Sequence, residues 1–177
     1  MIKKKKTTKT GLYTKKVMEH FKTPHNWGKM KNPDGIGKVG NTVCGDVMWL
    51  YLKVGKDKKD REIVKDVKFE TFGCVAAIAT SSVITDLVKG KTLIEALDLS
   101  KEKIVKELGG LPPIKLHCSV LAADALFEAI YDYYKKQKRK IPEKLMLVHQ
   151  KIDKEKKEIE KRYSKWTKIE EKMHRKK

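Results

Sequence analysis

The chain has 177 residues, which is enough for one domain with a hydrophobic core and too few for a second domain of ordinary size. Its 42 Lys and Arg against 23 Asp and Glu give a formal net charge of +19, concentrated at the two ends. Residues 1–11 carry five lysines and no acidic residue, residues 12–134 carry 19 basic against 16 acidic residues, and residues 135–177 carry 18 against 7. Nucleic acid is therefore not expected as the main partner, because no zinc-finger spacing or aromatic-rich motif accompanies the lysines.

The lysine-rich start is not followed by the roughly 7–15 apolar residues of a signal peptide, and the sequence contains no transmembrane run. Three cysteines, an odd number, predict reduced thiols rather than a disulfide framework. We therefore expect a cytoplasmic protein with no membrane partner, whose thiols are free for metal binding or chemistry.

The first half of the chain predicts one short helix and two strands. Apolar spacing indicates an amphipathic helix over Tyr13–Phe21, followed by a loop rich in Gly and Pro over Pro24–Asn41. Val47–Val54 and Glu62–Phe72 have the composition of strands, and the polar run between them predicts a hairpin turn. These two strands should pair antiparallel.

The second half predicts helices. Val75–Val88 should form a largely buried helix, and Thr92–Leu97 and Ser100–Leu108 two short ones. The Pro112-Pro113 pair predicts an extended link, after which a helix should begin within Leu116–Ser119 and run through Tyr133. The predicted fold class is α+β, with a small antiparallel sheet of about three strands and helices packed on one face.

A basic helical extension is predicted for residues 135–177, after a flexible basic N-terminus (1–12) and a folded domain (13–134). Apolar residues recur there every seven positions, as at one of the two core positions of a coiled-coil heptad. The second core position is charged in places, so the coiled-coil pattern is weak. We expect a long helix that packs on the domain or self-associates, with a solvated tail as the alternative. The recurring residues are Leu145, Ile152, Ile159, Trp166 and Met173.

Each cysteine stands at a boundary between predicted elements. Cys44 precedes a strand, Cys74 lies between a strand and a buried helix, and Cys118 lies at a helix start. Loops and helix N-termini are places where metal ligands can meet and where thiolates are favoured. Asp46 and His117 are close in sequence to two of these thiols. Spacing alone leaves unliganded thiols, a metal site and a nucleophile open.

The set of three cysteines with Asp or His suits zinc, and it also suits a [2Fe–2S] cluster with one ligand that is not a thiolate. Replacing one thiolate by a carboxylate or imidazole loosens one corner of a cluster, and a permanent electron-transfer centre would more naturally use four cysteines. The remaining histidines are expected to be surface or packing residues: His20, His25, His149 and His174.

Four local motifs lie between about Tyr13 and Tyr134, and the last of them is the most specific. They are Tyr13-Thr14-Lys15-Lys16-Val17, Val43-Cys44-Gly45-Asp46, Thr71-Phe72-Gly73-Cys74 and Leu111-Pro112-Pro113-Ile114-Lys115-Leu116-His117-Cys118-Ser119. With these motifs the chain resembles the IscU/NifU N-terminal family of iron–sulfur scaffold proteins. The departures are Val75, where the family commonly has Gly, and Thr42-Val43, where Pro-Ala is frequent. Neither removes a ligand.

The resemblance implies a non-enzymatic scaffold that assembles a transient [2Fe–2S] cluster from Fe²⁺ and sulfur supplied by a cysteine desulfurase. Electrons would come from a ferredoxin or another donor, and the cluster would pass to apo iron–sulfur proteins. It implies Cys44, Cys74 and Cys118 as thiolate ligands, with Asp46 and His117 competing for the fourth position and Zn²⁺ as an occupant of the purified apo form. A homo-oligomer is also compatible. The implied docking peptide for an Hsp70-type chaperone, with its co-chaperone, is Leu111, Pro112, Pro113, Ile114 and Lys115.

Two alternatives remain at this stage. A SufU-like zinc-dependent sulfurtransferase would relay sulfur through Cys118 with the same ligand set. That subfamily typically has an insertion between its second and third cysteines and lacks the docking peptide, whereas the stretch from Cys74 to Cys118 is compact here. The other alternative is a zinc-stabilised interaction module whose basic tails bind RNA.

Overall fold

The computed structural model describes residues 11–41 and 44–174. Residues 1–10, which make up most of the predicted flexible start, lie outside this part of the chain. Thr42-Val43 lies outside it as well. No helix in the described ranges is long and apolar enough to cross a membrane. The elements in chain order are α1 (Lys15–Lys22), β1 (Gly35–Gly40), β2 (Val47–Lys56), β3 (Glu62–Phe72), α2 (Val75–Val88), α3 (Leu93–Leu97), α4 (Lys101–Glu107), the 3-10 turn η1 (Pro113–Lys115), α5 (His117–Lys136) and α6 (Glu143–His174).

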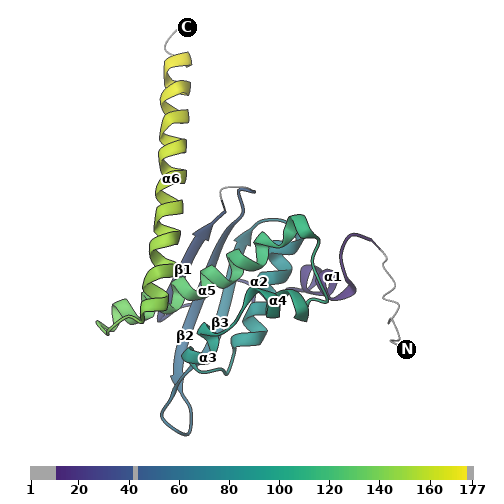
Figure 1. The fold of residues 1–177 in the computed structure, drawn as a ribbon, viewed down its shortest axis with the longest axis vertical. Coiled ribbons are helices and arrows are strands. Elements are labelled where there is room, and N and C mark those ends of the chain that lie inside the picture. Colours follow the sequence, from purple (N-terminus) through teal and green to yellow (C-terminus); the bar gives the residue numbers. More distant parts are fainter. Residues whose placement is uncertain (1–10, 42–43, 175–177) are drawn as a thin grey trace.

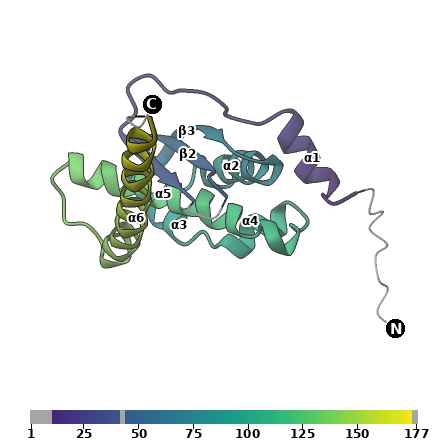
Figure 2. The same cartoon turned by 90° about the horizontal axis from the view of Figure 1, so that it is seen from above.

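The three strands form one antiparallel sheet in the order β1-β2-β3. Leu50 in the central strand β2 pairs with Gly37 of β1 and with Phe69 of β3. Helices α2 and α5 cover one face of this sheet (Figures 1 and 2). The predicted α+β class with helices on one face of a small sheet is therefore confirmed.

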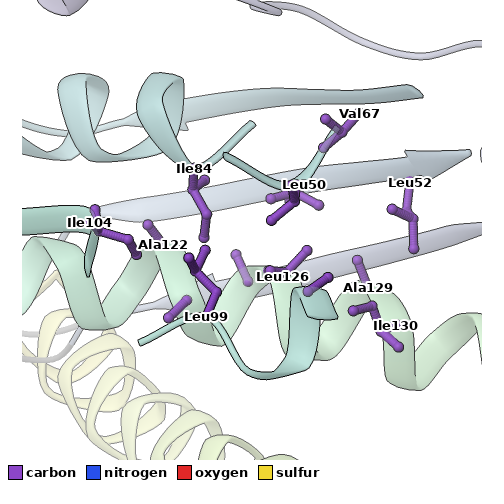
Figure 3. Packing of buried hydrophobic residues seen from close by; sticks show 14 of the residues in the cluster. Leu50, Leu52, Val67, Ile84, Leu99, Ile104, Ala122, Leu126, Ala129 and Ile130 are labelled. Carbon is purple, nitrogen blue, oxygen red and sulfur yellow. The ribbon is translucent and has the colours of Figure 1, made fainter. Parts of the chain in front are cut away.

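The hydrophobic core lies between the sheet and these two helices. Figure 3 shows Leu50 and Leu52 of β2 facing Leu126 of α5, with Ile84 of α2 beside them. All four side chains are fully buried. Side chains alternate between the two faces along β2, and this period of two places the fully buried Met48, Leu50 and Leu52 on the helix-covered face.

The prediction of a loop over Pro24–Asn41 is wrong for Gly35–Gly40, which forms the edge strand β1. Glycines at alternate positions carry no strand-forming side chains, so the pattern indicated a loop. Their role is close packing: a Cβ atom on Gly37 would lie 1.9 Å from the Ala125 carbonyl oxygen, and one on Gly35 2.1 Å from that of Ala129. Strand β1 therefore packs directly on the backbone of α5.

The helices predicted for residues 13–134 are confirmed, and α1 and α4 begin at side-chain caps. Thr14 caps α1 by accepting a hydrogen bond from the Val17 amide, and Ser100 caps α4 in the same way. Helix α2 has the predicted bounds. The extended link predicted at the Pro-Pro pair holds only at Pro112 (φ −56°, ψ 141°), because Pro113–Lys115 turns into η1. A proline at the first position of a helical turn costs nothing, since that position has no N–H partner to lose.

Helix α6 begins directly after Pro142 and packs its first turns on α5. Leu145 is 1% exposed and Ile152 is 7% exposed, whereas the C-terminal half of the helix extends beyond the body (Figure 1). His149 stacks on Tyr131 with ring centroids 3.8 Å apart and bonds Glu128 through Nδ1. The side chains of Ile159, Trp166 and Met173 lie outside the described part. Self-association of α6 and the domain boundary at residue 134 stay predictions.

The contact between α5 and α6 predicts a pH dependence of stability. Burial raises the pKa of Asp124, which faces Lys151 and Glu155 of α6, from 3.8 to about 6. Between these two values the folded chain binds more protons than the unfolded chain, so this residue's contribution to stability falls as pH rises from about 4 to about 6. Asp124→Asn should therefore raise the free energy of unfolding by about 1–2 kcal/mol at neutral pH and by almost nothing near pH 4.

Urea unfolding at the two pH values measures this difference. Asp98→Asn is the control, because the Asp98 side chain is 73% exposed and its replacement should change stability little at either pH. A gain for Asp124→Asn that is equal at both pH values would show that the charge of Asp124 is not the cause.

Candidate metal centre

The three thiols lie at one end of the molecule, where the β1–β2 loop meets the N-termini of α2 and α5. Cys44 is exposed in the loop, Cys74 is half-buried at the N-cap of α2, and Cys118 is fully buried in the first turn of α5. The sulfur atoms of Cys74 and Cys118 are 3.8 Å apart. Two sulfurs bound to one tetrahedral metal ion at about 2.3 Å would lie about 3.8 Å apart, so this pair is already spaced as a chelate.

The fold brings these segments together through the sheet. Val47 pairs with Phe72, so the residues just outside the two strand ends, Asp46 and Gly73, become neighbours. The start of α5 is held against α2 by the Thr80 hydroxyl, which donates to the Cys118 carbonyl at 3.2 Å. Cysteines 30 and 44 residues apart in the chain thus meet at one site.

Asp46 and His117 lie in the same cluster. One ligating atom from each of Cys44, Asp46 and His117 lies within 4.8 Å of the other two, and the same is true of Asp46, Cys74 and Cys118. Asp46 belongs to both triplets and so links them. The structure brings together all five residues that the sequence singled out as candidate ligands.

Two of these donors are buried without a hydrogen bond in the described structure. Asp46 Oδ2 and His117 Nε2 are both shielded from solvent, and no donor or acceptor among the described residues meets them. Buried polar atoms are almost always paired, because an unpaired one costs roughly 1–3 kcal/mol. A metal ion bound at this point would satisfy both atoms, so the donor set fits a metal group.

Gly73 leaves the room that the Asp46 side chain occupies. A Cβ atom on Gly73 would lie 3.0 Å from Asp46 Cγ and 2.8 Å from the Ala77 methyl group. Any other residue here would force the Ala77 methyl group or the Asp46 carboxylate to move. The Thr71-Phe72-Gly73-Cys74 motif thus carries a packing requirement as well as a ligand.

Two electrostatic effects act on the thiols of the site in opposite directions. Burial and the neighbouring Cys74 raise the pKa of the Cys118 thiol far above its ordinary value, and burial also raises the pKa of Cys44. The N-termini of α2 and α5 favour thiolate, but burial outweighs this partial charge. The thiols of Cys44 and Cys118 therefore stay protonated until a cation compensates the charge of their thiolates, so metal binding at these two residues releases protons.

Two further residues at this site were not predicted as part of it. Burial, and then the charge of Cys74, raise the pKa of the Tyr13 hydroxyl. Attraction to Cys74 raises the pKa of Lys115, whose ammonium group therefore lies beside the thiols. Both residues occur in the quoted motifs, but only the folded arrangement shows that they face the sulfur atoms.

The segment predicted as a docking peptide borders the site on η1. Ile114 is 72% exposed, and Leu116, directly after the segment, is 43% exposed. A cavity of about 400 Å³ lies beside it, between the start of α5 and α4, and His117 and Val105 line it. Among the other histidines, His20, His25 and His149 lie elsewhere in the fold, and the His174 side chain lies outside the described part.

Comparison with known proteins gives a consistent picture. The model of the NifU-like N terminal domain family matches residues 12–140. The iron-sulfur cluster assembly scaffold protein IscU 1 of Archaeoglobus fulgidus is 54% identical over 125 residues, which are 71% of this chain and 78% of that protein. The IscU scaffold protein of Aquifex aeolicus is 46% identical over 127 residues, covering 72% and 79%.

A solved structure supports the same assignment. The N-terminal NifU-like protein of Brucella abortus superposes with a TM-score of 0.54 at 26% identity, covering 71% of this chain and 96% of that one. The family model spans well over half of the chain, and the curated relatives share about half of the aligned residues. The resemblance read from the motifs is therefore confirmed: the chain belongs to the NifU-like N-terminal domain family.

Proposed function

We propose that this protein is a scaffold on which an iron–sulfur cluster is assembled and from which it is passed to other proteins. The observation that carries the proposal is the convergence of three thiols with two buried, unpaired polar donors, Asp46 and His117. Its relatives from Archaeoglobus fulgidus and Aquifex aeolicus are named as scaffolds of this kind. The cluster is cargo, and the chain acts as its holder rather than as an enzyme.

The donor set suits a [2Fe–2S] cluster. Such a cluster needs four protein ligands, two on each iron, and the site offers five donors: three thiols, one carboxylate and one imidazole. The spacing of Cys74 and Cys118 suits two ligands on one iron. Cys44 would then share the second iron with Asp46 or His117. A surplus donor and a ligand that is not sulfur both favour release, because an incoming thiol can replace them.

Asp46 should act in release as well as in binding. Its carboxylate belongs to both triplets, so it can compete with a thiolate for iron and open a coordination position for an acceptor thiol. We predict that Asp46→Ala lengthens the lifetime of the assembled cluster several-fold, measured as the decay of its visible absorption in the presence of a competing thiol.

Asp66→Ala is the matched control for this prediction. Asp66 bonds Lys89 on the surface, and its removal should leave the cluster lifetime unchanged. A cluster that decays faster in Asp46→Ala than in the wild type would mean that Asp46 is a necessary ligand and has no role in release.

Partners would approach from the side of the β1–β2 loop and η1. The exposed Ile114 on a proline-shaped turn offers an apolar contact for an Hsp70-type chaperone and its co-chaperone. The exposed Cys44 is the thiol most accessible to a persulfide from a cysteine desulfurase. A ferredoxin or another electron donor and apo iron–sulfur proteins complete the proposed set of partners. We also propose a cytoplasmic location, Fe²⁺ as the iron source, and Zn²⁺ as a substitute occupant of the site.

Cluster transfer tests the proposal. The protein is loaded anaerobically with desulfurase, cysteine, Fe²⁺ and a reductant that converts persulfide sulfur to sulfide, freed of excess reagents, and mixed with an apo-ferredoxin. A scaffold transfers its cluster, so the ferredoxin spectrum appears as that of the scaffold fades. The rival function, zinc-dependent sulfur relay, predicts that the protein accepts sulfur without ever holding iron and sulfide together, and that the ferredoxin stays empty.

A further inference from the structure

A second group of metal-binding side chains lies at the contact between α1 and α2, away from the cysteine site. His20 is on α1, His25 is in the loop that follows it, and Asp86 is in the last turn of α2. One ligating atom from each lies within 4.8 Å of the other two. Figures 1 and 2 both show α1 beside α2, so three separate segments supply the group.

The group is distinct from the cysteine site. Cys74 caps the N-terminus of α2, whereas Asp86 lies twelve residues further along. A helix rises about 1.5 Å per residue, so the two positions are about 18 Å apart along the helix. One metal ion cannot bridge them.

Hydrogen bonds already hold the His20 ring, the His25 backbone and the Asp86 carboxylate in position. Ser82 Oγ lies 2.8 Å from His20 Nδ1 and also accepts the His25 backbone N–H at 2.8 Å. Asn26 donates to Thr85 Oγ1 at 2.9 Å and to Asp86 Oδ1 at 3.3 Å. Bonds of this kind hold metal-binding histidines and carboxylates in position.

His25 Nδ1 and Asp86 Oδ2 are 2.6 Å apart, so this ring nitrogen and this carboxylate oxygen face each other. The ring centroids of His20 and His25 are only 4.9 Å apart, which brings the second imidazole to the same place. The side chains of His25 and Asp86 are 56% and 39% exposed, so an ion can reach them from solvent.

The charge state of the His20 ring also suits metal binding. Burial, and then the neighbouring His25, lower the pKa of His20, while Asp86 and Glu19 act in the opposite direction. A lowered pKa keeps this imidazole neutral near pH 7, which is the form that binds a metal.

From this arrangement we propose that His20, His25 and Asp86 form a second metal site, which binds a divalent transition-metal ion. Two imidazoles and one carboxylate suit Zn²⁺, Fe²⁺ or Co²⁺ rather than Mg²⁺ or Ca²⁺, which prefer all-oxygen ligands. Ser82 holds Nδ1 of His20, so this ring binds the ion through Nε2. The ion takes the place of the proton between His25 and Asp86, and water completes its coordination.

Only small movements are needed to close the site. Two ligands at about 2.1 Å from one ion lie roughly 3.0–4.2 Å apart, depending on the coordination geometry. Any pair close to the 4.8 Å limit must therefore approach slightly, and the 2.6 Å pair must separate slightly. Rotation of the exposed His25 and Asp86 side chains can supply both movements.

Metal binding here would fasten α1 to α2. Helix α1 follows Tyr13, which lies beside Cys74 and Cys118, so the clamp would also hold one wall of the cysteine site. A ligand that binds only the folded state raises its stability by mass action. The site therefore predicts a metal-dependent increase in melting temperature that requires His25 and Asp86.

Cobalt titration of the full chain tests the proposal, because Co²⁺ bound to thiolates gives intense near-ultraviolet charge-transfer bands and Co²⁺ bound to imidazole and carboxylate does not. The wild type should bind one Co²⁺ without such bands, in addition to any ion at the cysteines. His25→Ala and Asp86→Asn should each weaken this binding at least about tenfold. His149→Gln, which removes a histidine paired with Glu128 on the opposite side of the fold, is the control and should leave it unchanged.

Melting curves with and without Co²⁺ give a second readout. The increase in melting temperature from the extra ion should be smaller in His25→Ala and Asp86→Asn than in the wild type and the control. The proposal is overturned if every bound Co²⁺ shows thiolate bands, or if all four proteins bind the same number of ions with the same affinity. Neither result would affect the proposed scaffold function, which depends on the cysteine site.

Discussion

Gly37→Ala is expected to reduce the free energy of unfolding by at least about 3 kcal/mol, at or above the upper end of the range for overpacked cores. The added methyl group would lie 1.9 Å from the Ala125 carbonyl oxygen and 2.8 Å from the Ala129 amide nitrogen. Both obstacles are helix backbone, which cannot rotate away as a side chain can. Strand β1 would have to separate from α5, and that exposes the core face of the sheet.

Gly55→Ala is the matched control, since it adds the same methyl group to a strand of the same sheet. Its Cβ atom would meet side-chain atoms of the exposed Lys65, the nearest being Lys65 Cβ at 3.0 Å, so a shift of a few tenths of an ångström relieves the contact and no helix backbone has to move. We expect a change within about 1 kcal/mol. Urea unfolding of both variants measures the difference. A Gly37→Ala protein as stable as Gly55→Ala would show that β1 does not pack on α5 as closely as described.

Cys118→Ser should reduce cluster assembly to background while leaving the fold intact. Cys118 is fully buried and its sulfur lies 3.8 Å from that of Cys74, so it supplies one of the two thiols that are already spaced to bind one metal ion. A serine hydroxyl is similar in size but is a hard, protonated oxygen donor that binds iron weakly in comparison with a thiolate. The assembled cluster, measured by visible absorption and by bound iron and sulfide, should fall at least about tenfold.

Ser119→Ala controls for disturbance of the same helix start. Ser119 bonds the Leu116 carbonyl at 2.7 Å and is not a candidate ligand. This variant should keep the wild-type yield, and circular dichroism should show that both variants are folded. A Cys118→Ser protein with the wild-type amount of cluster would remove Cys118 from the ligand set.

Most secondary structure could be predicted because local chemistry decides it. Helix α2 has the predicted bounds because an apolar run ends at glycine, and α4 begins where the Ser100 cap predicts. Strand β1 could not be predicted, because its glycines are selected by contact with α5, a helix about 90 residues further along the chain. The turn at η1 was missed because a Pro-Pro pair fixes only the residue before the second proline as extended.

The residues of the site were predicted from the sequence, but their arrangement in space was not. The placement of Cys44, Cys74 and Cys118 at element boundaries indicated function, and the motifs indicated which function. Pattern alone could not show that Asp46 links two ligand triplets, because strand register brings its neighbours together. The group of His20, His25 and Asp86 was missed for the same reason. Asp86 lies over 60 residues after the two histidines in the sequence, and single histidines on a helix or in a loop carry no distinguishing pattern.

The central claim is that three thiolates and one oxygen or nitrogen donor hold one cluster within a single chain. Mössbauer spectroscopy of the anaerobically loaded wild-type protein tests it most directly. We predict two iron environments in equal amounts, one with two thiolate ligands and one with a single thiolate and a harder donor. A spectrum showing only isolated Fe²⁺ ions, or a protein that retains no iron after loading, would contradict the claim.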